Sequence, residues 1–149
     1  MNKENSFPNH DRFKFRVWDN VRKEYNRYQS IYLAQEGGVC YPLLDGGMTF
    51  PDEDSEYIIE QCTGLRDVNG ELIYEGDVIR YDKLYEGYTF VVKWKPDMVM
   101  FVLWDINKGG SAILGAGVEQ CAEIIGNIHT MSVKSDPSDK SDLSEEASK

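Results

Sequence analysis

The chain contains few side chains that could carry out chemistry. It has two histidines and three cysteines in 149 residues. His10 lies in a polar N-terminal stretch and His129 in a predicted terminal strand, so neither is a convincing base for a cysteine nucleophile. A zinc site needs about four Cys or His ligands at local spacing, and the sequence has no such spacing. We predict no catalytic residue and no metal site.

The phosphate-binding and membrane signals are also missing. Glycine clusters occur at 109–110 and 115–117, but neither is followed by the Lys-Ser/Thr of a P-loop, so we predict no cofactor. No apolar run approaches the roughly 20 residues of a membrane span, and residues 1–6 lack the pattern of a secretory signal. Cys40, Cys62 and Cys121 form no Cys-x-x-Cys pair, which favours reduced and mostly buried thiols. We therefore expect a cytoplasmic protein that does not bind membranes.

Positive charge is scarce overall but is concentrated in one segment. The net charge of −10 disfavours nucleic acid as a partner, because phosphate must be neutralised by cations. Residues 12–27 nevertheless contain six basic and two acidic residues, whereas residues 45–60 contain six acidic residues and no basic one. Two solvated surfaces of opposite sign are the simplest interpretation. A contact between subunits, or between the basic segment and an acidic partner, is the alternative.

Composition divides the chain into an arm, a domain and a tail. Residues 1–11 are polar and predict a flexible arm, and residues 132–149 are acidic and Ser-rich and predict a disordered tail. Between them, residues 12–131 form the predicted domain, with an N-terminal part (12–56, of which 35–56 is loop-like) and a C-terminal part (57–131). Trp18-Asp19 and Trp104-Asp105 do not make a repeat array, and we interpret their similarity as coincidence.

The periodicity of the domain predicts a mainly β fold. Phe13, Phe15 and Val17 alternate with cations, which predicts a strand with these apolar side chains facing inward and a turn at Asp19-Asn20. Further strands are predicted at 57–61, 88–94, 99–104 and 123–129, with a hairpin turn at 95–97 and a glycine-rich loop at 106–117. The stretch 25–34 fits both a helical and a strand pattern, and we favour an extended one. Short strands at close spacing predict a small barrel or sandwich.

The most specific stretch is residues 63–79, which we interpret as a compact β corner. Asn69-Gly70 and Gly76 tolerate the positive φ angles that tight turns need. The stretch is also rich in carboxylates, but it lacks the glycine that an EF-hand loop requires at its sixth position. We therefore assign turn-forming roles here and at a predicted bulge; the residues are Gly64, Asp67, Asn69, Gly70, Gly76, Asp77 and Gly126.

Three segments of the chain together resemble one family. Residues 13–19 (FKFRVWD), 61–79 (QCTGLRDVNGELIYEGDVI) and 123–129 (EIIGNIH) closely resemble the YopX family, in the family's order. Family members occur mainly in bacteriophages and prophages of Gram-positive bacteria, and His129 stands where they often carry an aromatic residue. The resemblance implies a mostly β fold with a small SH3-like barrel in the C-terminal half. It implies no enzymatic activity, and it suggests homo-oligomers.

With no catalytic, metal or cofactor site predicted, we expect the protein to act by binding another macromolecule. We expect a non-enzymatic accessory protein that contacts a host or phage protein, or another copy of itself. The candidate contact residues are Trp18 and Tyr74, because aromatic side chains dominate interface energies, and the cations Arg12, Lys14 and Arg16. A core position is the alternative for each aromatic. A nucleic-acid accessory protein is the rival, in which the basic aromatic segment 12–32 would contact phosphates and stack on bases.

Overall fold

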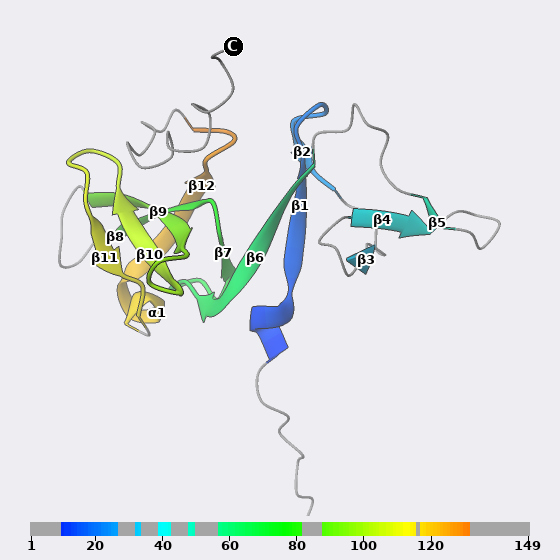
Figure 1. Ribbon diagram of the computed structural model, residues 1–149. Coiled ribbons are helices and arrows are strands. Elements are labelled where there is room, and N and C mark those ends of the chain that lie inside the picture. The colour runs from blue at the N-terminus through cyan, green and yellow to red at the C-terminus, as the bar shows by residue number, and fades with distance from the viewer. Residues whose placement is uncertain are drawn as a thin grey trace, which may run out of the picture.

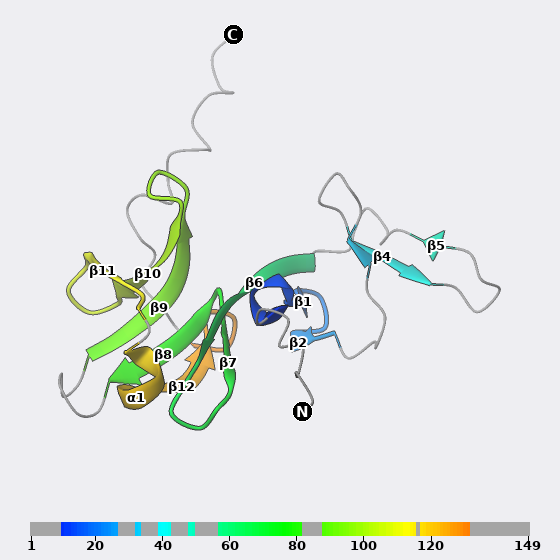
Figure 2. The same cartoon turned by 90° about the horizontal axis from the view of Figure 1, so that it is seen from below.

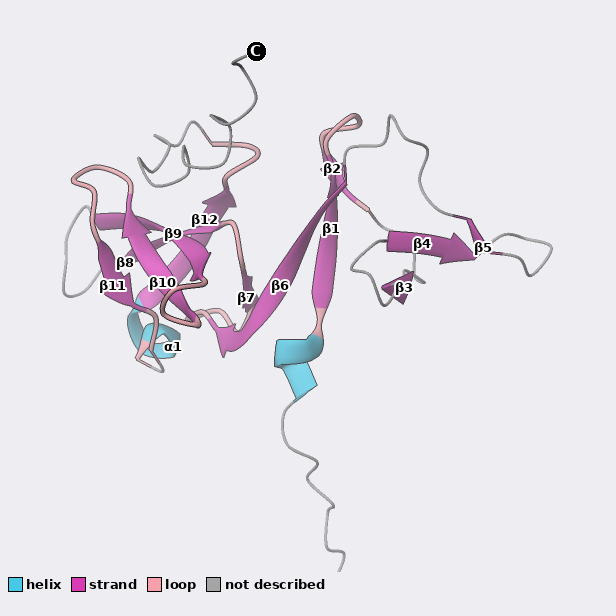
Figure 3. Cartoon of the chain, viewed as in Figure 1, coloured by secondary structure: helices cyan, strands magenta, loops and turns pink. Residues whose placement is uncertain are grey.

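The computed structural model describes residues 10–26, 32–33, 39–42, 48–49, 57–81, 88–115 and 117–131. They form a mainly β fold (Figures 1 and 3). The predicted tail 132–149 and residues 1–9 of the predicted arm lie outside the described residues, whereas residues 10 and 11 begin a 3-10 helix. The elements are η1 (His10–Phe13), β1 (Phe15–Asp19), β2 (Glu24–Tyr25), β3 (Tyr32–Leu33), β4 (Val39–Pro42), β5 (Met48–Thr49), β6 (Tyr57–Arg66), β7 (Leu72–Tyr74), β8 (Asp77–Tyr81), β9 (Tyr88–Lys95), β10 (Met100–Asp105), β11 (Ser111–Ile113), α1 (Val118–Cys121) and β12 (Ala122–Asn127).

Within the described residues, the strands are arranged in three antiparallel sheets. One has the order β2-β1-β6-β7, the second β11-β10-β9-β8-β12, and the third consists of the short strands β3-β4-β5. The five-stranded sheet curves into a half-barrel with α1 at one end, and the long strand β6 runs from the half-barrel to β1 (Figure 1). A barrel-like fold is therefore confirmed, whereas its assignment as SH3-like stays a prediction.

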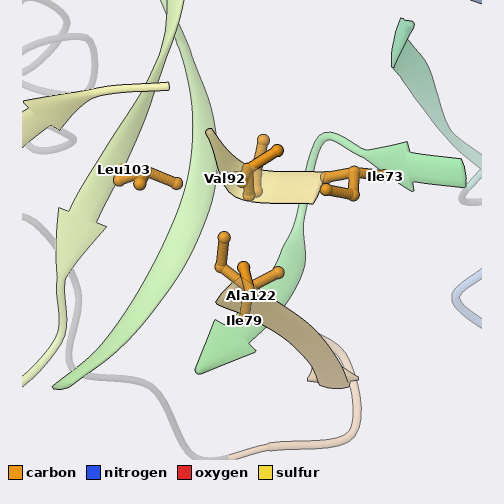
Figure 4. Close-up of a cluster of buried hydrophobic side chains, with 6 residues drawn as sticks. Ile73, Ile79, Val92, Leu103 and Ala122 are labelled. Carbon is orange, nitrogen blue, oxygen red and sulfur yellow. The ribbon is translucent and has the colours of Figure 1, made fainter. Parts of the chain in front are cut away.

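The core lies inside the half-barrel. Its buried cluster consists of Ile73, Ile79, Val92, Leu103, Val118 and Ala122. Figure 4 shows five of these side chains converging from β7, β8, β9, β10 and the start of β12. Because alternate residues of a strand share a face, Val92 and Leu103, which are directly opposed in the β9–β10 register, mark the core face of that hairpin.

Aspartate side chains organise the turns. Oδ1 of Asp19 accepts the N–H groups of Val21 and Arg22 at 2.9 and 2.8 Å, which confirms the predicted turn after β1. Oδ1 of Asp105 accepts the N–H groups of Asn107 and Lys108 in the same way at 2.8 and 3.0 Å. The two Trp-Asp pairs thus end strands by a common local device, an Asp side chain that holds the following backbone.

The inward face predicted for the first strand was wrong for two of its three residues, and one of these, Phe13, lies in η1, before β1 begins. Phe13 and Phe15 are 57% and 42% exposed, whereas Val17 is buried. The neighbouring Arg16 faces the interior instead, because buried carboxylates pair with its guanidinium. Alternation identifies the two faces of a strand, but it cannot show that a cation on one of them has buried partners.

Several boundaries also differ from those predicted. The first predicted strand of the C-terminal part continues to Arg66, so Gly64, at φ 82, lies in an irregular stretch of β6 and not in a turn. The predicted loop 106–117 contains strand β11, and the loop-like segment 35–56 contains β4 and β5. In contrast, the register shift between Ile124 and Gly126 confirms the predicted bulge in β12.

Candidate functional site

The stretch 63–79 forms the predicted β corner, and Asp67 organises its first turn. Oδ1 of Asp67 accepts the N–H groups of Asn69 and Glu71 at 2.8 and 3.0 Å, while Oδ2 accepts that of Ile124 at 3.1 Å. Burial opposes ionisation of Asp67, but the backbone donors outweigh it and hold its pKa below the ordinary value. The side chain therefore ties the turn to β12, and its oxygens are already used within the chain.

The two glycines at the turns of the corner adopt left-handed backbone conformations. Gly70 has φ 83 and Gly76 has φ 82, as their turn positions predict. A Cβ at Gly70 would meet nothing within 4 Å, but one at Gly76 would lie 2.5 Å from Oε1 of Glu60. Gly76 thus permits both its conformation and the close approach of a buried carboxylate.

That carboxylate belongs to a buried polar network centred on Arg16. The guanidinium of Arg16 donates from Nε to Oε2 of Glu60 and from Nη2 to Oδ1 of Asp77, both at 2.6 Å. Oδ2 of Asp77 accepts the N–H group of Tyr74 at 2.8 Å. The side chains of Glu60 and Asp77 are 3% and 2% exposed. Burial raises the pKa of Asp77 above its ordinary value, although the charge of Arg16 acts in the opposite direction.

Aromatic residues close the network on its other side. Nε2 of His129 lies 2.7 Å from Oε1 of Glu60, and the hydroxyl of Tyr25 donates to Oε2 at 3.0 Å. The His129 ring stacks on Trp18 with centroids 4.5 Å apart and an interplanar angle of 6°. Burial raises the pKa of Tyr25, so its phenol stays protonated and continues to donate.

A buried Glu-His pair beside an arginine resembles an acid–base site. However, a substrate must reach such a site, and this pair is almost inaccessible to solvent. The side chain of His129 is only 8% exposed, and both oxygens of Glu60 are already in hydrogen-bond contact with other side chains of the chain. Among the described residues there is also no group of three His, Cys, Asp or Glu side chains that could hold a metal ion. The network therefore fits a structural role, in which it holds β1, β2, β6, β8 and the turn after β12 together.

The structure separates the five predicted contact residues. Trp18 is 2% exposed and lies within the network, so it offers no surface to a partner in this conformation. Lys14, Arg16 and the half-buried Tyr74 line a groove of about 560 Å³ beside the corner, together with Arg66, Asp67, Asn69, Glu71, Leu72 and Ile124. Arg12 lies in η1.

The cations of this groove are paired within the chain. Lys14 and Arg66 both bind the carboxylate of Asp11, at 2.7 and 2.8 Å, and Arg16 holds the buried network. In the turn after β1, Lys23 donates to the side chain of Asn20 at 2.7 Å. These cations are therefore poorly suited to neutralise the phosphates of a ligand.

A different surface is exposed at the end of the β9–β10 hairpin. Trp94 and Phe101 are directly opposed and continue the core face of Val92 and Leu103 outward. Their rings pack edge to face with centroids 5.1 Å apart, yet Trp94 is 41% exposed. Met98 and Val99 in the loop are 47% and 73% exposed. We call Trp94, Met98, Val99 and Phe101 the hairpin surface; the loop that carries two of them projects beyond β8 and β12 (Figure 2).

Val99 also has an unfavourable backbone conformation. Its φ is 53, whereas the predicted strand began at this residue and β10 begins at Met100. Left-handed backbone is disfavoured for L-residues and is a clear outlier for a β-branched one. The equivalent last positions of the turns after Asp19 and Asp105 are held by Lys23 and Gly109, at φ 58 and 73. Val99 thus occupies a position where glycine would be least strained, and its apolar side chain faces solvent.

Sequence reasoning missed both the network and the hairpin surface. The network depends on residues far apart in sequence, and the only local signal was His129 in place of an aromatic residue. For the hairpin there was a readable signal. The loop after Pro96 and Asp97 continues with the apolar residues Met98 and Val99, although hairpin loops normally carry Gly, Asn or Asp at such positions.

Comparison with known proteins identifies the family. The family model described as YopX protein matches residues 14–133. Among solved structures, protein EF1440 from Enterococcus faecalis superposes with a TM-score of 0.53 at 20% identity, over 78% of this chain and 92% of that one. Protein yopX from Bacillus subtilis gives 0.49 at 16% identity, over 77% and 91%. A search of curated proteins gives no significant match. Because the family model covers far more than half of the sequence, the chain belongs to the YopX family.

Proposed function

We propose that this protein is a non-enzymatic accessory protein of a phage or prophage that acts in the host cytoplasm by binding a protein partner through the hairpin surface. The half-barrel, which we interpret as SH3-like, is the rigid scaffold that presents this surface. The observation that carries the proposal is Val99, which is 73% exposed at φ 53. Strained conformations persist where function requires them.

The composition of the hairpin surface supports a protein partner. Aromatic residues and Met are enriched in the centres of protein interfaces. Trp94 has the largest side chain of the four residues and is held by its edge-to-face contact with Phe101, so little side-chain entropy is lost when a partner covers it. Complete burial of a fully exposed large apolar side chain contributes about 1.5–3 kcal/mol, and covering Trp94, which is 41% exposed, contributes part of this.

The nucleic-acid alternative receives less support. Four cations of the basic segment have partners within the chain: Lys14 pairs with Asp11, Arg16 with Glu60 and Asp77, Arg22 with Asp19, and Lys23 with Asn20. A gel shift at about 50 mM salt, where electrostatic binding is strong, distinguishes the two functions. We expect no shift, and a salt-dependent shift would favour the alternative.

Affinity capture and light scattering test the proposed function. Protein made in its host should retain a discrete partner that is lost from the variant Trp94→Ser/Val99→Ser and kept by the control Val21→Ser. Val21 is 68% exposed in the turn after β1 and so matches the exposure of the hairpin residues. If the partner is a second copy, light scattering of the purified protein shows a dimer or larger species that dissociates in the hairpin variant. A partner that is retained equally by both variants, or no partner together with a monomeric mass, contradicts the proposal.

A further inference from the structure

The hairpin surface has a carboxylate at its edge. Oε1 of Glu75, in the turn between β7 and β8, accepts the backbone N–H group of Trp94 at 3.3 Å. The adjacent Gly76 donates its N–H group to the carbonyl of Val92 at 2.9 Å. These two bonds fix the turn along β9, so the Glu75 carboxylate lies next to the base of the Trp94 side chain.

The charge of this carboxylate is not neutralised by an ion pair among the described residues. Its described hydrogen bond is the one from Trp94, and Lys93 affects it only as a more distant charge. Lys93 lies on the opposite face of β9, with its ammonium 5.9 Å from the centroid of the Trp104 ring. Burial raises the pKa of Glu75 above its ordinary value, because the lost solvation outweighs the hydrogen bond from Trp94 and the charge of Lys93, and the charge of Glu60 acts in the same direction as burial.

We propose that the hairpin surface binds a protein segment that places a Lys or Arg side chain over the Trp94 ring and against the Glu75 carboxylate, with apolar neighbours on Met98 and Val99. This proposal rests on the proposed function and names the chemistry of the partner. A cation prefers the face of Trp over that of other aromatic rings, and the carboxylate that is hydrogen-bonded to the Trp94 backbone adds an ion pair.

The electrostatics of the whole chain agree with a basic partner. The net charge is −10, so a positively charged segment is attracted before contact. A second copy of this chain would approach with the same net charge, and its described cations Lys14 and Arg16 are already paired with its own acidic residues. We therefore favour a basic segment of another protein, and self-association is an outcome that would count against the inference.

Peptide titration tests the cation site directly. The probes are two acetylated pentapeptides, Ala-Leu-Arg-Leu-Ala and the same sequence with citrulline, which keeps the shape of arginine but lacks its charge. The readout is the indole N–H signal of Trp94 in an NMR spectrum, assigned with Trp94→Phe. We expect the arginine peptide to bind at least about fivefold more tightly than the citrulline peptide, from the combined cation–π and ion-pair contributions.

Variants separate this inference from the proposed function. Glu75→Gln should remove the preference for arginine while both peptides still shift the Trp94 signal. Asp97→Asn makes the same charge change in the β9–β10 loop and should preserve the preference. Equal affinity of the two peptides, no shift with either, or dimer formation through this surface contradicts the cation site. The proposed function is tested separately, by whether the hairpin variant loses the captured partner. That experiment requires no particular charge on the partner.

Discussion

His129 and Glu60 are 69 positions apart in the sequence, yet Nε2 of His129 lies 2.7 Å from Oε1 of Glu60. This bond joins the turn after β12 to the strand that links the half-barrel with β1. Glu60 in turn binds Arg16, so one buried carboxylate connects the beginning, middle and end of the described fold. Buried groups paired in this way are costly to disturb, and the first predictions concern them.

Arg16 is the cation on which the buried network depends. Replacing it by Gln leaves Glu60 and Asp77 buried without their shared counter-charge, which should lower the free energy of unfolding by about 3 kcal/mol or more. Lys14→Gln is the control, since Lys14 is 53% exposed and its loss should change stability little. Urea unfolding at pH 7 measures both, and equal effects of the two substitutions would contradict the structural role of the network.

Gly76 and Gly70 differ in what an added methyl group would meet. Gly70→Ala suffers only its left-handed conformation, at φ 83, and should cost about 1 kcal/mol. Gly76→Ala adds a 2.5 Å contact with Oε1 of Glu60 and should cost about 3 kcal/mol in total. Urea unfolding of the two variants isolates the contact with Glu60. A Gly76→Ala variant as stable as Gly70→Ala would mean that Glu60 can move away freely.

Glu75 predicts a specific dependence of stability on pH. Burial raises its folded pKa above the unfolded value of 4.5, so the folded state holds the proton more tightly. The contribution of protonated Glu75 to the free energy of unfolding is fully present below the unfolded pKa and is lost as pH rises through the folded pKa. Glu75→Gln should therefore be more stable than the wild type at pH 7, with a smaller difference at about pH 4.5. Unfolding curves at both pH values provide the test; a less stable variant at pH 7 would show that a cation already pairs with Glu75.

Val99 should show a conflict between stability and binding. Val99→Gly relieves the left-handed backbone and should stabilise the protein by about 0.5–1 kcal/mol, net of the greater entropy of glycine in the unfolded chain. Thermal unfolding measures this gain. Val21→Gly serves as control, because Val21 is not among the residues with positive φ and should lose stability. A stabilised Val99→Gly protein that still captures its partner as well as the wild type would remove the functional reason for the strain.

Much of the fold could be predicted from local patterns, but the site could not. Gly70 and Gly76 indicated left-handed turns, and the 95–97 turn placed the β9–β10 hairpin, because these features depend on neighbouring residues alone. Glu60, Arg16 and His129 meet only after three distant segments pack together. Phe13 and Phe15 were predicted to face inward because apolar residues alternate with cations there. Alternation does not reveal that one of these cations, Arg16, has buried partners. The exposure of Trp94 depends on which other segments pack over the end of the β9–β10 hairpin, and the sequence of β9 does not specify this.

The central claim, that the hairpin surface contacts a protein, is tested most directly by photo-crosslinking in the cell. p-Benzoylphenylalanine is placed at position 99 and, as a control of similar exposure, at position 21. We predict a discrete crosslinked protein from position 99 that disappears when Trp94 is changed to Ser, and no corresponding product from position 21. The account is contradicted if position 99 gives no discrete product, or if the same product forms from both positions.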